Sequence, residues 1–133
     1  MIDNKDLLKL LNYLLENNPD KLNSLDYTSL SESNNINMEF ILVTLDKNWN
    51  FNYLSINSKI TWDDIKNNPD LAWNSNFVGM NPNITLDIIL NNPDYPWNWD
   101  SISQNPSMSW EIVSNNLTLN WNYSLLVNTY TYK

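Results

Sequence analysis

Short apolar stripes alternate with polar turns along most of this 133-residue chain. Within the stripes, apolar residues recur at positions i, i+3 and i+4, the spacing that places side chains on one face of an α-helix. The pairs with this spacing are Trp62 and Ile65, Leu86 and Ile89, Trp110 and Val113, Phe51 and Leu54, Trp99 and Ile102, and Tyr123 and Leu126. The pattern predicts an all-α fold built from helices of only about two turns.

Polar residues at the ends of the stripes predict where these helices begin and end. Thr61 precedes one stripe and Asp64 follows three residues later, which is the pattern of a capping box. Asn98 precedes another stripe, and asparagine is among the best N-cap residues. The tetrapeptide Asn-Asn-Pro-Asp ends a helix, because proline cannot continue one. It occurs at 17–20, 67–70 and 91–94.

Equivalent residues return every 24 positions. Two independent series share this period, one of tryptophans and one of mixed apolar residues. The first series is Trp49, Trp73, Trp97 and Trp121, and the second is Met38, Trp62, Leu86 and Trp110. The period divides the chain into four units of 24 residues, preceded by a divergent leader. These parts are the leader 1–37 and the units 38–61, 62–85, 86–109 and 110–133.

Each unit reads as two short helices, which are too short to be stable alone and must stack on their neighbours. We therefore predict an α-solenoid, a fold in which each unit buries its apolar face against the next. The leader is interpreted as a capping unit with one longer helix at 4–17, and the segment 130–133 as the closure of the last unit. The curvature of the stack, and whether the second helix of each unit is α or 3-10, stay open.

The amino-acid composition excludes several kinds of chemistry. The chain has no Cys, His or Arg, so it cannot form disulfides, thiolate or imidazole metal sites, or a Ser-His or Cys-His catalytic pair. Its 15 acidic and 7 basic residues give a net charge of -8, which argues against nucleic-acid binding, since affinity for phosphates comes from Lys and Arg. Asp63 and Asp64 are adjacent, but sequence neighbours on a helix do not face each other. We expect no catalytic residue, no metal ligand, no cofactor and no enzymatic activity.

Signals for export or membrane insertion are also missing from the sequence. The first residues lack the basic stretch and the apolar run of a signal peptide, and no apolar segment approaches the length that spans a bilayer. We expect a cytoplasmic protein without membrane contacts.

The tryptophans have two interpretations. Exposed tryptophan beside Asn and Asp is typical of sugar-binding clefts, whereas burial of one tryptophan removes roughly 150 to 250 Å² from water. One large anchor in every unit is what a short helical repeat needs, so we predict core positions for all six tryptophans of the two series. They are Trp49, Trp73, Trp97, Trp121, Trp62 and Trp110.

The combination of Asn-Asn-Pro-Asp with Trp-Asn-Trp, intact at 97–99, and Asn-Pro-x-Ile-Thr resembles tandem repeat proteins of giant DNA viruses of the mimivirus group. The resemblance covers 38–133 well and the leader weakly. The 27 Asn against one Gln, and seven Lys against no Arg, indicate AT-rich coding sequence, so many surface asparagines are expected to be neutral. The resemblance implies a viral protein of short helical repeats, located in the host cytoplasm, a viral factory or the virion. It supplies no catalytic motif.

Function is predicted from the positions that differ between units. A solenoid presents equivalent positions of successive units on one extended surface, which favours a scaffold that binds a host or viral protein. The variable positions before the anchor tryptophans are Lys47, Asn48, Leu71, Ala72, Tyr95 and Pro96. Two alternatives stay open: a structural, self-associating component of a virion or viral factory, and carbohydrate binding through exposed Trp and Tyr.

Overall fold

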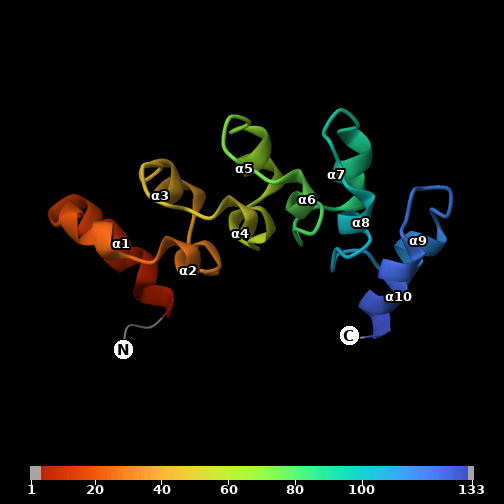
Figure 1. The fold of residues 1–133 in the computed structure, drawn as a ribbon, viewed down its shortest axis with the longest axis horizontal. Coiled ribbons are helices and arrows are strands. Elements are labelled where there is room, and N and C mark those ends of the chain that lie inside the picture. The colour runs from red at the N-terminus through yellow and green to blue at the C-terminus, as the bar shows by residue number, and fades with distance from the viewer. Residues whose placement is uncertain (1–3, 132–133) are drawn as a thin grey trace.

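The computed structural model describes residues 4–131, and this part of the chain is helical without any β-strand. Helices alternate with turns from end to end (Figure 1). Their bounds are η1 (Asn4–Asp6), α1 (Leu7–Asn17), η2 (Pro19–Ser24), α2 (Tyr27–Ser31), α3 (Met38–Leu42), α4 (Phe51–Ile56), α5 (Trp62–Lys66), α6 (Ser75–Val78), α7 (Leu86–Asn91), α8 (Trp99–Ile102), α9 (Trp110–Ser114) and α10 (Tyr123–Thr131). The predicted all-α fold class is confirmed for these residues.

The helices form two rows along an arc (Figure 1). The odd-numbered helices α1, α3, α5, α7 and α9 lie in the outer row, and the even-numbered ones lie in the inner row. Along the inner row, α2 contacts α4, α4 contacts α6, and α6 contacts α8. The two ends of the chain therefore lie at opposite ends of the arc.

The helix starts follow the predicted caps. At α5 the Thr61 hydroxyl accepts from the Asp64 N–H, and the Asp64 carboxylate accepts from the Thr61 N–H, which completes the capping box. The asparagines before α4, α6, α8 and α10 each accept a main-chain N–H from the first turn of the helix. They are Asn50, Asn74, Asn98 and Asn122. The sequence did not decide whether the second helix of each predicted unit is α or 3-10. In the structure these helices are α-helices, and α4, α6 and α8 have only four to six residues.

The N-terminal helix is shorter than predicted. The range 4–17 divides into the 3-10 turn η1 and the α-helix α1, because the side chain of Asp6 makes no capping hydrogen bond and the first turn tightens. Of the closing segment predicted at 130–133, residues 130 and 131 belong to α10, and residues 132 and 133 lie outside the described part of the chain.

The core runs between the two rows of helices and contains buried apolar side chains from most of the helices and from the turns between them. The fully buried members include Leu11, Leu22, Phe40, Ile41, Leu54, Ile60, Val78, Ile84 and Ile102. Trp49 and Trp121 are buried, and Trp73 and Trp97 are half-buried, so all four contribute to this core. Each donates its indole N–H to a main-chain oxygen five residues earlier: Thr44, Asn68, Asn92 and Asn116.

Core positions for the second tryptophan series are predicted correctly only in part. Trp62 is half-buried, because the rings of Tyr95 and Trp97 lie against it at centroid distances of 5.1 and 5.3 Å. Trp110 is 72% exposed, so its assignment to the core is wrong. The physical reason is the absence of a cover: among the side chains described, which end at residue 128, no aromatic ring packs on Trp110.

Three asparagines form a buried ladder through the middle of the molecule. Asn57, Asn81 and Asn105 are 6%, 0% and 1% exposed. The Asn81 amide donates to the carbonyls of Asn57 and Ile60, and its oxygen accepts the Asn83 N–H. The neutrality expected of surface asparagines does not extend to these buried ones, since a buried main-chain carbonyl without a partner costs stability.

Candidate functional site: an aromatic cleft

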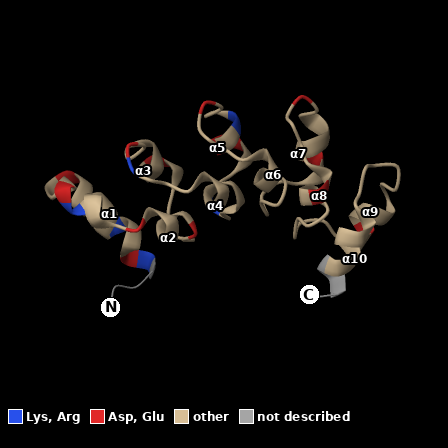
Figure 2. Cartoon of the chain, in the orientation of Figure 1, with Lys and Arg blue, Asp and Glu red and all other residues tan. Residues whose placement is uncertain are grey.

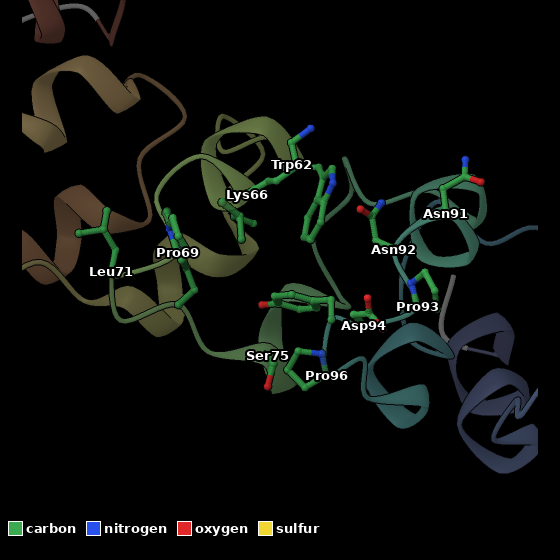
Figure 3. A pocket seen from close by; sticks show the side chains of 13 residues that line it. Trp62, Lys66, Pro69, Leu71, Ser75, Asn91, Asn92, Pro93, Asp94 and Pro96 are labelled. Carbon is green, nitrogen blue, oxygen red and sulfur yellow. The ribbon is translucent and has the colours of Figure 1, made fainter.

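A cleft of about 550 Å³ opens between α5 and the loop that follows α7 (Figure 3). We call it the aromatic cleft. Its lining residues are Trp62, Ile65, Lys66, Pro69, Leu71, Trp73, Ser75, Asn91, Asn92, Pro93, Asp94, Tyr95 and Pro96. Figure 3 shows the Trp62 ring projecting from α5 into the space between Lys66 and Asn92. The cleft thus combines apolar and aromatic walls with a few polar groups, the usual composition of a binding site.

The aromatic wall is built from two successive pairs of helices. Trp62 is the first residue of α5, directly after the Thr61 cap. Tyr95 lies in the loop after α7, and its ring meets that of Trp62 edge to face at an interplanar angle of 87°. Tyr95 also contacts Trp97, with ring centroids 4.6 Å apart. Edge-to-face pairs add about 0.5 to 1.5 kcal/mol to area burial, so this wall is preformed.

The loop that carries Tyr95 is held by its own hydrogen bonds. The Tyr95 N–H donates to the Asn92 carbonyl over 3.2 Å, and the Trp97 N–H donates to the Tyr95 carbonyl over 2.8 Å. The same Asn92 carbonyl accepts the Trp97 indole N–H over 2.8 Å. Pro93 and Pro96 restrict the loop further, because the proline ring fixes φ. The rigid loop keeps the cleft open without a bound partner.

Charged groups lie around the cleft rather than inside it. Lys66 forms an ion pair with Asp63 over 3.4 Å, and both side chains are largely exposed, so the pair contributes little to stability. Asp46, Asp70 and Asp94 are exposed in the loops after α3, α5 and α7, and Figure 2 shows acidic residues at the tips of these loops. These three carboxylates follow the outer row of helices. Asp70 and Asp94 lie in the two loops that border the cleft, so the surface around it carries negative charge.

The pKa of the Tyr95 phenol is raised, because burial disfavours the phenolate. Burial, followed by the charge of Asp46, also raises the pKa of Tyr27. Hydrogen bonds from Ser29, first from its hydroxyl and then from its main chain, lower the pKa of Asp26. Both tyrosines therefore stay protonated near neutral pH, and the Tyr95 hydroxyl is available as a hydrogen-bond donor at the cleft.

The structure brings together three of the six predicted contact residues. Leu71, Tyr95 and Pro96 line the aromatic cleft. Lys47 and Asn48 line a separate, more polar hollow of about 480 Å³. There the Lys47 ammonium already donates to Asn23 over 2.7 Å and pairs with Asp46 over 3.1 Å.

The sixth predicted residue, Ala72, lies apart from the cleft. It lines a third, shallower hollow together with Asn48 and Trp49. Conversely, Trp62 and Pro69 line the cleft although the sequence placed Trp62 in the core and assigned Pro69 only to a turn. A period of 24 residues shows which positions are equivalent, but not which positions of adjacent units touch, so these two were missed.

Among residues 4–131, no group of three or more carboxylates could hold a metal ion. The aromatic cleft contains one carboxylate, Asp94, and one ammonium, Lys66, both at its exposed rim. Within the same range, no helix is both long and apolar enough to cross a lipid bilayer. The arrangement is suited to binding by packing and hydrogen bonding.

Comparisons with protein-family models, with curated proteins and with solved structures found no match to this chain.

Proposed function

We propose that the chain is an α-solenoid of four 24-residue units, 38–61, 62–85, 86–109 and 110–133, capped by the leader 1–37. Recurring hydrogen bonds support this architecture. The main-chain N–H groups of Asn50, Asn74 and Asn122 donate to the hydroxyls of Ser31, Ser55 and Ser103, each 19 residues earlier. The asparagine ladder repeats in the same way, from Asn57 to Asn105. Contacts repeated between successive units are what a solenoid requires.

The solenoid serves as a non-enzymatic scaffold that binds a protein partner through the aromatic cleft. The observation that carries this proposal is the position of Leu71, Tyr95 and Pro96, which differ between units and meet in one preformed cleft. Hydrophobic and aromatic walls with fixed geometry are the usual anchors of protein contacts. A cleft bordered by two loops fits an extended peptide segment better than a flat protein surface.

Charge complementarity favours a basic segment as the partner. Asp70 and Asp94 are exposed beside the cleft, and the whole chain carries a net charge of -8. Opposite charge on the partner would accelerate the encounter, and an apolar or proline side chain would fill the cleft. In this proposal the protein is viral, from a giant DNA virus, and acts in the host cytoplasm, the viral factory or the virion. The support for that origin is the motif combination and the AT-rich coding bias.

Site-specific photocrosslinking tests the proposed scaffold. A photoreactive phenylalanine analogue replaces Tyr95 in one variant and Tyr13, which is 60% exposed on α1, in a matched control. In lysate of infected and uninfected host cells, we expect a protein partner to crosslink from position 95 and not from position 13. The crosslink should disappear when Leu71→Asp is added and weaken with rising salt. Equal crosslinking from both positions, or quenching of tryptophan fluorescence by simple glycans instead, would contradict the proposal.

A further inference from the structure

Two residues of the aromatic cleft carry hydrogen-bond donors that the described chain does not use. Within residues 4–131, the indole N–H of Trp62 and the hydroxyl of Tyr95 have no acceptor. Both donors remain accessible, since no fully buried side-chain nitrogen or oxygen in the same range lacks a partner. The third ring of the cleft differs, because the indole N–H of Trp73 donates to the Asn68 carbonyl over 2.9 Å. Two donors in the cleft are therefore available to a bound molecule.

The two unused donors restrict what can fill the cleft. A molecule that covers these rings has to supply hydrogen-bond acceptors, because a donor buried without a partner costs binding energy. The face of an α-helix supplies few, since its main-chain carbonyls are bonded within the helix. Addition of a β-strand needs a sheet edge, and residues 4–131 contain no strand. A polyproline II segment supplies the acceptors, because it has no internal hydrogen bonds and its carbonyls are free.

The apolar part of the lining suits proline side chains. The rings of Trp62 and Tyr95 meet the apolar side chains of Leu71, Pro69 and Pro96 around a space of about 550 Å³. Such a volume accepts a few residues of a peptide, as in other binding sites of roughly 300 to 1,000 Å³. A polyproline II helix has three residues per turn, so two prolines three positions apart face the same side. Its rigid conformation also keeps the entropy cost of binding low.

Charge at the rim of the cleft favours a basic residue beside the prolines. Asp70 and Asp94 are exposed in the two loops that border the cleft. The ammonium group of Lys66 already pairs with the Asp63 carboxylate over 3.4 Å, so its charge is largely compensated. An acidic segment would meet repulsion here, whereas Lys or Arg on the bound segment would be attracted.

We propose that the aromatic cleft binds a proline-rich protein segment in the polyproline II conformation, flanked by Lys or Arg. The indole N–H of Trp62 and the hydroxyl of Tyr95 donate to main-chain carbonyls of the segment, and its proline rings pack on the aromatic wall. The flanking basic side chain lies near Asp70 or Asp94. This inference rests on the proposed scaffold and specifies the kind of segment that the scaffold binds.

Selection from a random peptide library displayed on phage tests which segment the cleft prefers. The full chain is the bait, and phage that also bind the Leu71→Asp variant are removed first, so the peptides that remain depend on the cleft. We expect enrichment of peptides with two prolines three positions apart and Lys or Arg beside them. In fluorescence anisotropy, replacing both prolines of a selected peptide by alanine should weaken binding about tenfold or more. Enrichment of peptides without proline, or no enrichment, would overturn the inference.

Removal of a single hydroxyl tests the proposed hydrogen bond. Tyr95→Phe keeps the ring and loses the donor, and we expect it to bind the selected peptide about fivefold more weakly. Tyr53→Phe is the matched control, because Tyr53 is half-buried on α4 and lines a different hollow. It should bind like the natural chain, and circular dichroism verifies that both variants are folded. Equal affinities of the two variants would contradict the bond from Tyr95.

The inference and the proposed scaffold can fail separately. Equal crosslinking from positions 95 and 13 contradicts the scaffold, whatever peptides the library yields. A partner that crosslinks from position 95 through a segment without proline leaves the scaffold intact and overturns this inference. Mass spectrometry of the crosslinked peptide distinguishes these results.

Discussion

The side-chain amide of Asn105 donates a hydrogen bond to the main-chain carbonyl of Asn81, 24 residues earlier, over 2.9 Å. The amide of Asn81 in turn donates to the carbonyl of Asn57 over 3.2 Å. Each of these side chains therefore satisfies the main-chain carbonyl of the previous member of the ladder. The ladder connects successive turns through the interior, where water cannot replace it.

Replacing Asn105 by alanine should lower the free energy of unfolding by about 3 kcal/mol. The reason is that its amide serves three buried carbonyls, those of Gly79, Asn81 and Ile84. Urea unfolding followed by circular dichroism measures the change. Asn12→Ala, at an exposed position of α1, is the control and should change stability by about 0.5 kcal/mol or less. Equal effects of the two substitutions would show that the ladder does not stabilise the fold.

Trp97 and Trp110 should respond very differently to substitution by alanine. Trp97 contacts the rings of Trp62 and Tyr95 and donates its indole N–H to Asn92, so its removal should cost about 3 kcal/mol. Trp110 is 72% exposed, and its removal should cost about 0.5 kcal/mol or less. Thermal and urea unfolding of both variants provide the comparison. A Trp97→Ala protein as stable as the natural chain would place that side chain outside the core.

The raised pKa of Tyr95 predicts a late step in the alkaline titration of the tyrosines. Because the folded state keeps this proton above the ordinary tyrosine pKa of about 10, stability should fall as the pH rises through the folded pKa. Phenolate absorbance should show Tyr27 and Tyr95 among the late groups of the natural chain, because the pKa of each is raised. Tyr95→Phe should lose one late group and lose less stability at high pH. An unchanged titration curve in the variant would contradict the placement of Tyr95 in the cleft wall.

Local features of the fold were predictable from the sequence because caps and stops act over a few residues. The Thr61 and Asp64 capping box and the Asn98 cap are examples, and the structure contains both. The anchor tryptophans were also predictable, since a large apolar residue in every unit must find a core. The burial of Trp49 and Trp121 agrees with that argument.

Contacts between successive pairs of helices were harder to predict, because they depend on how one pair lies on the next. Trp110 was assigned to the core with Trp62 on the basis of the period alone, yet only Trp62 receives a cover from the following loop. The buried asparagines were hidden for a different reason. Asn57, Asn81 and Asn105 recur at the 24-residue spacing, but in a chain with 27 asparagines this signal is easily lost. Half of the predicted contact residues line the cleft. The others line hollows beside different helices.

A deletion of one complete unit tests the proposed repeat architecture most directly. Removal of 86–109 joins Thr85 to Trp110, so the Thr85 cap replaces Ser109 before α9 and the following contacts keep their register. A matched control removes 86–97, half a unit, and places an inner-row helix where an outer-row helix belongs. Circular dichroism during urea unfolding shows whether each protein is helical and unfolds cooperatively. We predict a cooperative helical protein for the 24-residue deletion and loss of cooperative folding for the control. Failure of the 24-residue deletion to fold, or equal folding of both, would contradict a stack of equivalent units.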